Sequence, residues 1–274
     1  AGLLVGLGGA GASFGIVMGS VGRLVSPELR SWAFGTIVAA NSLGMAIYAV
    51  LDPALITAFG WQATLLILAT VMLVVIPLAF MYRDDRGSAA AGGQTVAQAL
   101  AEAVGHRSYW LLVAGFFVCG YHVAFIQVHL PAFVVDQGLP LWVGGTAIML
   151  IGLLNIVGSY TAGVLGGKRS KKNLLCVIYL ARSVVIAAYV SLPPSTGVTL
   201  AFAAAMGVLW LSTVPLTSGL VAVMFGPRYM ATLFGIVFLS HQLGALLGVW
   251  LGGWWFDLTG SYAAVWWTMI GMGL

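Results

Sequence analysis

Residues 163–182 read GVLGGKRSKKNLLCVIYLAR, and this stretch decides the fold class. Between two long apolar runs, four of five consecutive positions are basic: Lys168, Arg169, Lys171 and Lys172. Short basic loops between apolar segments are typical of the cytoplasmic side of membrane proteins. Ten residues after the last lysine, the second apolar run contains a lone charge, Arg182. The stretch therefore predicts two membrane-spanning helices joined by a cytoplasmic loop, with one charge inside the second helix.

The composition extends this interpretation to the whole chain. Hydrophobic residues make up 61% of the 274 residues and charged residues 7%, whereas roughly a quarter of the residues in a soluble domain are charged. Open strands would leave backbone groups unsatisfied in lipid, which favours helices. We therefore predict an all-α, polytopic membrane helical bundle. Its nine spans are expected at about residues 2–22, 33–51, 62–82, 109–133, 142–166, 173–192, 197–224, 230–255 and 262–274.

The loops alternate in charge along the chain. Those after the first, third, fifth and seventh spans carry Lys or Arg, whereas the alternate loops carry Asp52, Asp136 and Asp257 and no basic residue. The positive-inside rule places the basic loops in the cytoplasm, so Ala1 starts outside a cell (inner or plasma) membrane. An odd number of spans with an external start leads us to expect further helices before Ala1. The short last span is expected to be cut, because about twenty apolar residues are needed to cross a bilayer.

A polar segment divides the spans into two groups. We predict a partial N-terminal bundle of three spans at 1–82, a cytoplasmic linker at 83–108, and a C-terminal bundle of six spans at 109–274. Within the linker, Thr95–Val104 predicts a short surface helix, because Thr95 and Gln98 have capping-box spacing.

Glycine and proline spacing predicts how some helices pack. Glycine recurs every fourth residue in two spans, at Gly11, Gly15 and Gly19 and at Gly244, Gly248 and Gly252. Such rows let a neighbouring backbone approach closely. We expect them to pack within a monomer, with dimerisation as the weaker alternative. Pro215 is expected to kink the seventh span.

Arg182 is the one formal charge inside the predicted spans, which contain no Asp or Glu. It lies about 15 Å along a helix from Lys172, near the bilayer centre, where a charge is costly. Since a guanidinium binds a carboxylate through two hydrogen bonds, an anionic substrate is one expected counter-ion. The alternative is that Arg182 bonds backbone carbonyls or an acid elsewhere in the protein.

Histidines supply the other ionisable groups of the spans. His122 and His129 lie seven residues apart on one predicted helix face, and the pair His241–Gln242 lies near the middle of another span. Without carboxylates nearby, His122 or His241 is expected to handle protons, although hydrogen-bonded packing is the alternative. The full set of expected substrate contacts is His122, Arg182, Trp210, His241, Gln242, Asn155 and Asn41.

Other functions fit the sequence poorly. The net charge of +4 comes from short loops without a basic, aromatic-rich stripe, so no nucleic-acid partner is expected. The histidines and cysteines lack metal-ligand spacing, and we expect neither a metal nor a cofactor. We do not expect an enzyme, since the spans offer no set of nucleophile, base and acid.

Three segments match family patterns. Gly163, Leu165, Lys168, Lys171, Lys172 and Leu175 are similar to the major facilitator superfamily's loop signature G-x-L-a-D-R-x-G-R-K-x-x-L. The acidic position is Gly167 here, and the later glycine is Ser170. RSWAFG at 30–35 and FDLTGSY at 256–262 resemble the bacterial monocarboxylate-porter-like members. The chain thus resembles this superfamily over its whole length.

The resemblance implies a fold and a function. The nine spans would be helices four to twelve of a twelve-helix transporter, with the first three missing. The implied activity is secondary transport by alternating access about a midplane site. We expect a small organic anion such as a monocarboxylate, moved by proton symport or exchange. The alternative is an exporter of apolar or drug-like compounds.

The family's architecture also ranks the candidate residues. Its central cavity is usually lined by helices one, four, seven and ten, which favours His122 and Trp210. Arg182 would lie on helix nine, in the outer ring, so a structural role is nearly as strong an expectation as substrate binding. The signature loop, with Gly163, Lys168, Arg169, Lys171 and Lys172, is expected at a cytoplasmic gate.

Overall fold

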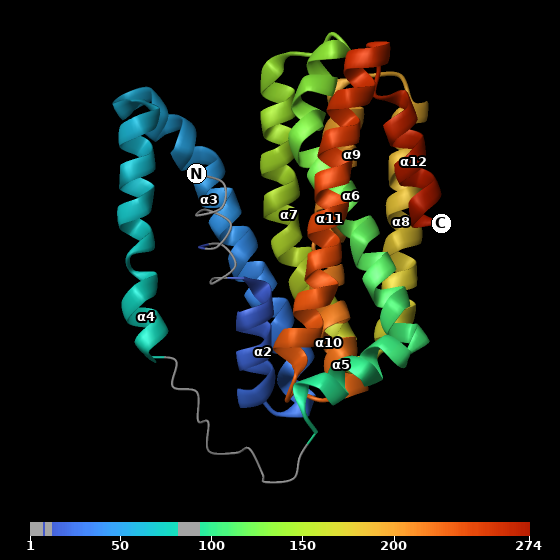
Figure 1. Cartoon of the computed structure of the whole chain (residues 1–274). Coiled ribbons are helices and arrows are strands. Elements are labelled where there is room, and N and C mark those ends of the chain that lie inside the picture. The colour runs from blue at the N-terminus through green and yellow to red at the C-terminus, as the bar shows by residue number, and fades with distance from the viewer. Residues whose placement is uncertain (1–7, 9–12, 82–93) are drawn as a thin grey trace.

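Every regular element in the described part of the chain is a helix. The computed structural model describes residues 8, 13–81 and 94–274, and Figure 1 shows most of their helices gathered in one bundle, with α4 standing away from it. The elements are α2 (Phe14–Leu24), α3 (Pro27–Met72), α4 (Val75–Met81), α5 (Val96–Gly105), α6 (Arg107–Asp136), α7 (Leu141–Lys168), α8 (Lys171–Ser191), α9 (Thr196–Leu209), α10 (Thr213–Phe225), α11 (Met230–Thr259) and α12 (Ala263–Gly273).

Six described segments are long and apolar enough to cross a membrane. They are Leu51–Phe80, Arg107–Asp136, Leu141–Lys168, Lys171–Ser191, Thr196–Phe225 and Met230–Thr259. The predicted all-α, polytopic membrane bundle is therefore confirmed. The count of nine spans stays a prediction, because the start of the first predicted span lies outside the described residues.

Helices α6 and α11 pack closely along glycines. A Cβ atom on Gly248 would lie 2.6 Å from the carbonyl oxygen of Tyr121, and one on Gly244 would overlap the carbonyl of Phe117. In the opposite direction, a Cβ on Gly120 would overlap the carbonyl of His241. The predicted packing of the second glycine row within the chain is confirmed.

The first glycine row packs against α11 as well. A Cβ on Gly15 would lie 3.7 Å from Gly235 Cα, and one on Gly19 would lie 2.9 Å from Ala231 Cα. Gly11, the first member of the predicted row, lies outside the described residues. The two described glycines confirm packing within the chain.

The expected loop at 52–61 is wrong in its extent. Helix α3 continues through this region and departs from helical geometry only at Gly60, where φ is 76°. A positive φ is readily adopted by glycine, so one residue suffices to redirect the chain. Asp52 therefore lies inside a helix rather than in a loop.

The span that contains Pro215 is interrupted rather than kinked. Helix α9 ends at Leu209, and α10 begins at Thr213. Proline has no N–H group to bond the carbonyl four residues earlier, which is that of Leu211. That missing bond accounts for a weak point in the ladder just before Pro215, and the helix separates there into two.

The predicted surface helix is present as α5. Its capping box is complete: Gln98 N donates to Thr95 Oγ1 at 3.2 Å, and Thr95 N donates to Gln98 Oε1 at 2.8 Å. Trp110 Nε1 of α6 donates to the Val104 carbonyl at 2.8 Å. These bonds fix α5 at the start of α6, at the lower end of the helices in Figure 1. The rest of the predicted linker, up to residue 93, lies outside the described residues.

We predict that Gly120→Ala destabilises the protein by about 1–3 kcal/mol, because overpacking would force α6 away from α11. Thermal unfolding of the purified protein in detergent measures the effect. Gly145→Ala is the matched control, since a Cβ there meets nothing within 4 Å. Equal unfolding temperatures for the two variants would contradict the close α6–α11 contact.

Candidate functional site

The break between α9 and α10 is the centre of the candidate site. It falls within the apolar segment Thr196–Phe225, after the 14 residues of α9 and before the 13 residues of α10. A helix end leaves backbone carbonyls and N–H groups without partners, and lipid offers none. Side chains from neighbouring helices bond several of these groups.

Arg182 of α8 bonds the end of α9. Its Nε and Nη2 donate to the Leu209 carbonyl at 3.2 Å and 2.7 Å, and Nη2 also donates to the Trp210 carbonyl. The side chain is fully buried. A cation is favourable at the C-terminal end of a helix, where carbonyl dipoles point outward. This geometry matches the structural alternative for Arg182.

One part of the Arg182 guanidinium remains unused. Its Nη1 is buried and has no hydrogen-bond partner within the described ranges. The guanidinium lies over the Tyr179 ring, 5.6 Å from its centroid, and the Tyr179 hydroxyl donates to the Gly115 carbonyl at 2.6 Å. Arg182 thus has a free donor beside the helix break.

Asn155 of α7 bonds the other side of the break. Its Oδ1 accepts from Leu211 N at 2.8 Å, and its Nδ2 donates to Ser42 Oγ of α3 at 2.6 Å. Asn155 and Ser42 are both fully buried. The predicted site residue Asn155 therefore connects the broken helix with α3, a helix of the predicted N-terminal bundle.

His122 of α6 is buried in the bundle, and it lies within electrostatic range of Arg182. Its Nε2 is 2.8 Å from the Met269 carbonyl. Because a carbonyl only accepts, Nε2 carries the hydrogen and the neutral ring keeps a lone pair on Nδ1. That Nδ1 is buried and has no partner within the part of the chain that is described.

His241 of α11 lies close to the break through Cys119. The Cys119 thiol is 3.2 Å from Thr213 Oγ1, at the first residue of α10, and within electrostatic range of both His241 and Arg182. The His241 ring stacks on Phe238, with centroids 5.5 Å apart, and its Nδ1 is 3.1 Å from Gln242 Oε1. Cys119 was not among the predicted substrate contacts, and its position beside Thr213 has no signal in the sequence.

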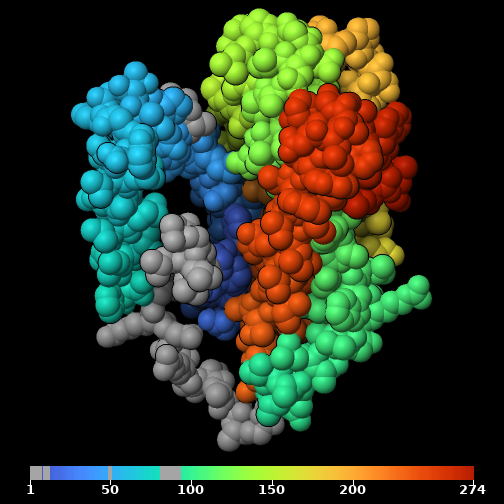
Figure 2. All heavy atoms as spheres, turned by 45° about the horizontal axis from the view of Figure 1, so that its top comes forward, coloured from blue at the N-terminus to red at the C-terminus, as the bar shows by residue number. Residues whose placement is uncertain are grey.

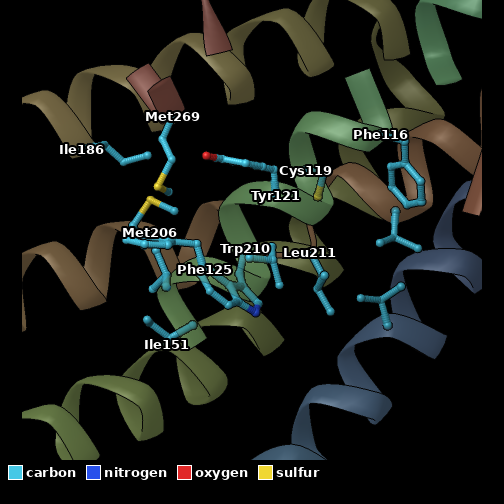
Figure 3. Close-up of a cluster of buried hydrophobic side chains, with 14 of the residues drawn as sticks. Phe116, Cys119, Tyr121, Phe125, Ile151, Ile186, Met206, Trp210, Leu211 and Met269 are labelled. Atoms are coloured by element: carbon cyan, nitrogen blue, oxygen red, sulfur yellow. The ribbon is translucent and has the colours of Figure 1, made fainter. Parts of the chain in front are cut away.

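Trp210 lies in the break itself and is 1% exposed. Figure 3 shows it in a buried apolar layer with Phe125, Ile151 and Met206. Its indole Nε1 lacks a hydrogen-bond partner among the residues described. Three predicted residues, Arg182, Asn155 and Trp210, thus meet at the interruption of the helix, and the predicted residues His122 and His241 lie near it.

Two predicted residues differ from this group. Asn41 of α3 and Gln242 of α11 are exposed. His129, which was weighed alongside His122, lies farther along α6 and bonds the Val249 carbonyl through Nε2 at 3.0 Å.

The predicted gate residues meet the RSWAFG segment. A Cβ on Gly163 of α7 would lie 2.6 Å from Gly35 Cα and 2.7 Å from the Ser31 carbonyl. The side chain of Lys171 lies over Gly219 of α10, while Lys168, Arg169 and Lys172 are exposed. Two segments that the sequence singled out separately therefore form one contact between α3 and α7.

The contact between α3 and α7 extends from the end at the basic loop to Gly152, where a Cβ atom would lie 4.0 Å from Ala46 N of α3. Trp32 Nε1 donates to Tyr160 OH at 3.4 Å, and the Asn155–Ser42 bond lies farther along. After Ala46, which is still buried, α3 becomes exposed, with Leu51 at 40% and Phe59 at 62%. Figure 2 shows the later part of α3, together with α4, standing apart from the other helices.

Comparison with known proteins gives one family. A model described as Major Facilitator Superfamily matches residues 1–249. The uncharacterised MFS-type transporter YcxA of Bacillus subtilis is 26% identical over 253 residues, which cover 86% of this chain and 60% of that protein. Monocarboxylate transporter 12 of Rattus norvegicus is 24% identical over 298 residues, covering 96% of this chain and 61% of that protein. The chain thus spans about 60% of the length of these two relatives.

We predict that Arg182→Ala lowers the free energy of unfolding by about 1–3 kcal/mol, because the carbonyls of Leu209 and Trp210 lose their donor in a buried place. The free energy of unfolding of Arg182→Lys should lie between those of the unmodified protein and of Arg182→Ala, since a single ammonium group replaces the planar guanidinium. Thermal unfolding measures the series, with exposed Arg169→Ala as the control. An unchanged unfolding temperature in Arg182→Ala would show that the bonds to α9 do not stabilise the fold.

Proposed function

This chain belongs to the Major Facilitator Superfamily, and from that premise we propose that it is part of a secondary transporter of small organic anions that works by alternating access. The proposed substrate class is a monocarboxylate, taken up with a proton or in exchange. The bound anion would lie beside the break between α9 and α10.

The observation that carries the substrate class is the state of Arg182. In the described part of the chain its hydrogen bonds go only to backbone carbonyls, and Nη1 remains unpartnered. A buried guanidinium with a free N–H group suits a carboxylate. Discontinuous helices near the midplane form the substrate sites of many transporters. The name of the rat relative, a monocarboxylate transporter, favours the same class.

The chemistry of His122 supports coupling to protons. Its Nδ1 lone pair would repel an anion, whereas a proton on Nδ1 would turn the same atom into a charged donor. The bond from Nε2 to the Met269 carbonyl is kept in both states. Because His122 lies within electrostatic range of Arg182, protonation and anion binding would favour each other.

The α3–α7 contact supports alternating access. The two helices contact each other from Gly35 and Gly163 to Ala46 and Gly152, whereas the later part of α3 is exposed, with Leu51 at 40% and Phe59 at 62%. If the basic loops are cytoplasmic, this arrangement corresponds to an outward-facing state. Opening of the Gly35–Gly163 contact would then produce the inward-facing state.

Uptake into proteoliposomes tests the proposal directly. The full-length protein is expected to take up short monocarboxylates, faster with an inward proton gradient. Neutral and cationic aromatic compounds serve as the comparison. If the uptake of every carboxylate stays at the background level, the assignment of an anionic substrate is excluded. Uptake of the comparison compounds alone would favour an exporter of apolar compounds.

We predict that His122→Gln removes the response of uptake to the pH gradient. The glutamine amide can still donate to the Met269 carbonyl but cannot take up a proton. The matched control is His129→Gln, which changes the same residue type farther along α6. A pH–rate profile that is the same in His122→Gln and in the unmodified protein would exclude His122 from coupling.

We predict that Gly163→Val shifts the population toward the inward-facing state, because the added side chain cannot fit against Gly35. Spin labels at Leu51→Cys, within α3, and at Trp142→Cys, at the start of α7, report the distance between the two helices on the side away from the basic loop. That distance should shorten in Gly163→Val. Gly44→Val is the control, since a Cβ there meets nothing within 4 Å; identical distance distributions in the two variants would argue against the gate.

A further inference from the structure

Three basic side chains at the turn between α7 and α8 take no part in the contacts described so far. They are Lys168, Arg169 and Lys172, and together they are called the basic turn below. All three are exposed, and their side chains form no hydrogen bond or ion pair with another residue in the described part of the chain. Lys171 differs from them, because its side chain packs over Gly219 of α10.

The basic turn also lacks an acid of its own. No Asp or Glu occurs between Gly163 and Arg182, and Gly167 occupies the position where the superfamily's signature has an acid. Charges that no neighbour neutralises attract anions from the surroundings. The basic turn therefore suits an anionic partner, which could be dissolved in water or be part of the membrane.

The exposed face of α8 indicates which of the two it is. Lys172, Cys176, Leu180 and Val184 follow one another at steps of four residues, so they lie along one face of the helix. All four are exposed, Leu180 by 47% and Val184 by 65%. The last three of them are called the α8 row below.

The α8 row is about as long as one leaflet of a membrane is deep. The 12 residues from Lys172 to Val184 span about 18 Å at 1.5 Å per residue. Half of a hydrocarbon core of about 30 Å is about 15 Å. A positively charged end followed by an apolar face of this length matches a phospholipid with an anionic headgroup. A dissolved anion would use only the charged end.

We propose that the basic turn and the α8 row together bind an anionic phospholipid. Its phosphate lies among Lys168, Arg169 and Lys172, and one acyl chain follows the α8 row. Each basic side chain near a membrane surface strengthens binding of an anionic lipid about fivefold, which corresponds to about 1 kcal/mol. A zwitterionic lipid binds more weakly, because its own cation balances its phosphate. The site is separate from the break between α9 and α10.

Cys176 supplies a reporter for this site. It is exposed in the α8 row, whereas Cys119 is buried, so a thiol-reactive bimane labels Cys176 of the full-length protein. The protein is placed in vesicles of phosphatidylcholine and phosphatidylglycerol, and the acyl chains of one or the other lipid are brominated. Bromine quenches bimane only at close range. The ratio of the two quenching extents therefore gives the enrichment of the anionic lipid at α8, expected to be at least about tenfold.

A pair of double variants separates a specific site from the general charge of the protein surface. Lys168→Gln with Lys172→Gln removes two charges from the basic turn and should lower the enrichment at least about fivefold. Arg107→Gln with Arg228→Gln is the matched control. It removes two exposed charges from the start of α6 and from the residue before Tyr229, and the enrichment should stay within about twofold of the unmodified protein, because neither residue lies in the basic turn.

Inorganic phosphate distinguishes a lipid from a dissolved anion. Phosphate should leave the enrichment the same as chloride does at equal ionic strength, since both salts screen charges alike. The proposal is overturned if phosphatidylglycerol quenches no more than phosphatidylcholine, if the two double variants lose enrichment equally, or if phosphate alone removes it. Quenching requires no transport, so the result stands whether or not the protein takes up carboxylates.

Discussion

Backbone hydrogen bonding in an apolar surrounding is the constraint on which the rest of this structure depends. A helix that breaks inside a membrane exposes carbonyls and N–H groups that lipid cannot satisfy. Here the guanidinium of Arg182 bonds the carbonyls at the end of α9, and the amide of Asn155 bonds the N–H group that follows them. Arg182, whose charge is costly to bury in a membrane, therefore stabilises the break, and its Nη1 has no partner within the described residues.

The break and the contact between α3 and α7 are linked through one side chain. Asn155 accepts a hydrogen bond from Leu211 in the break and donates one to Ser42 of α3. A little farther toward the basic loop, Gly163 crosses Gly35. A movement of α3 away from α7 must therefore disturb a group that bonds the candidate site. In the proposed transport cycle this is the physical route by which an anion at the break and opening of the gate affect each other.

Much of this arrangement follows from composition and spacing, and some of it does not. Apolar runs and basic loops predicted the membrane bundle, and isolated polar residues predicted Arg182, Asn155 and His122 as the ones to examine. The break was expected only as a kink, because a proline marks a missing bond but not how far the chain separates. The partners of Arg182 are backbone carbonyls, which carry no signature in a sequence. The helical continuation of α3 to Gly60 was missed because an acidic residue and a proline usually indicate a loop.

The central claim is that the unused N–H group of Arg182 binds the carboxylate of the substrate. Solid-state NMR measures this directly in full-length protein labelled with ¹⁵N-arginine, in lipid, with a carboxyl-¹³C monocarboxylate that the protein transports. The Arg182 signal is assigned by its loss in Arg182→Lys. The account predicts a dipolar contact between an Arg182 Nη and the carboxyl carbon at about 4 Å or less, as in a charge-assisted hydrogen bond. A saturated sample in which the Arg182 signal shows no contact with the carboxyl carbon would contradict it.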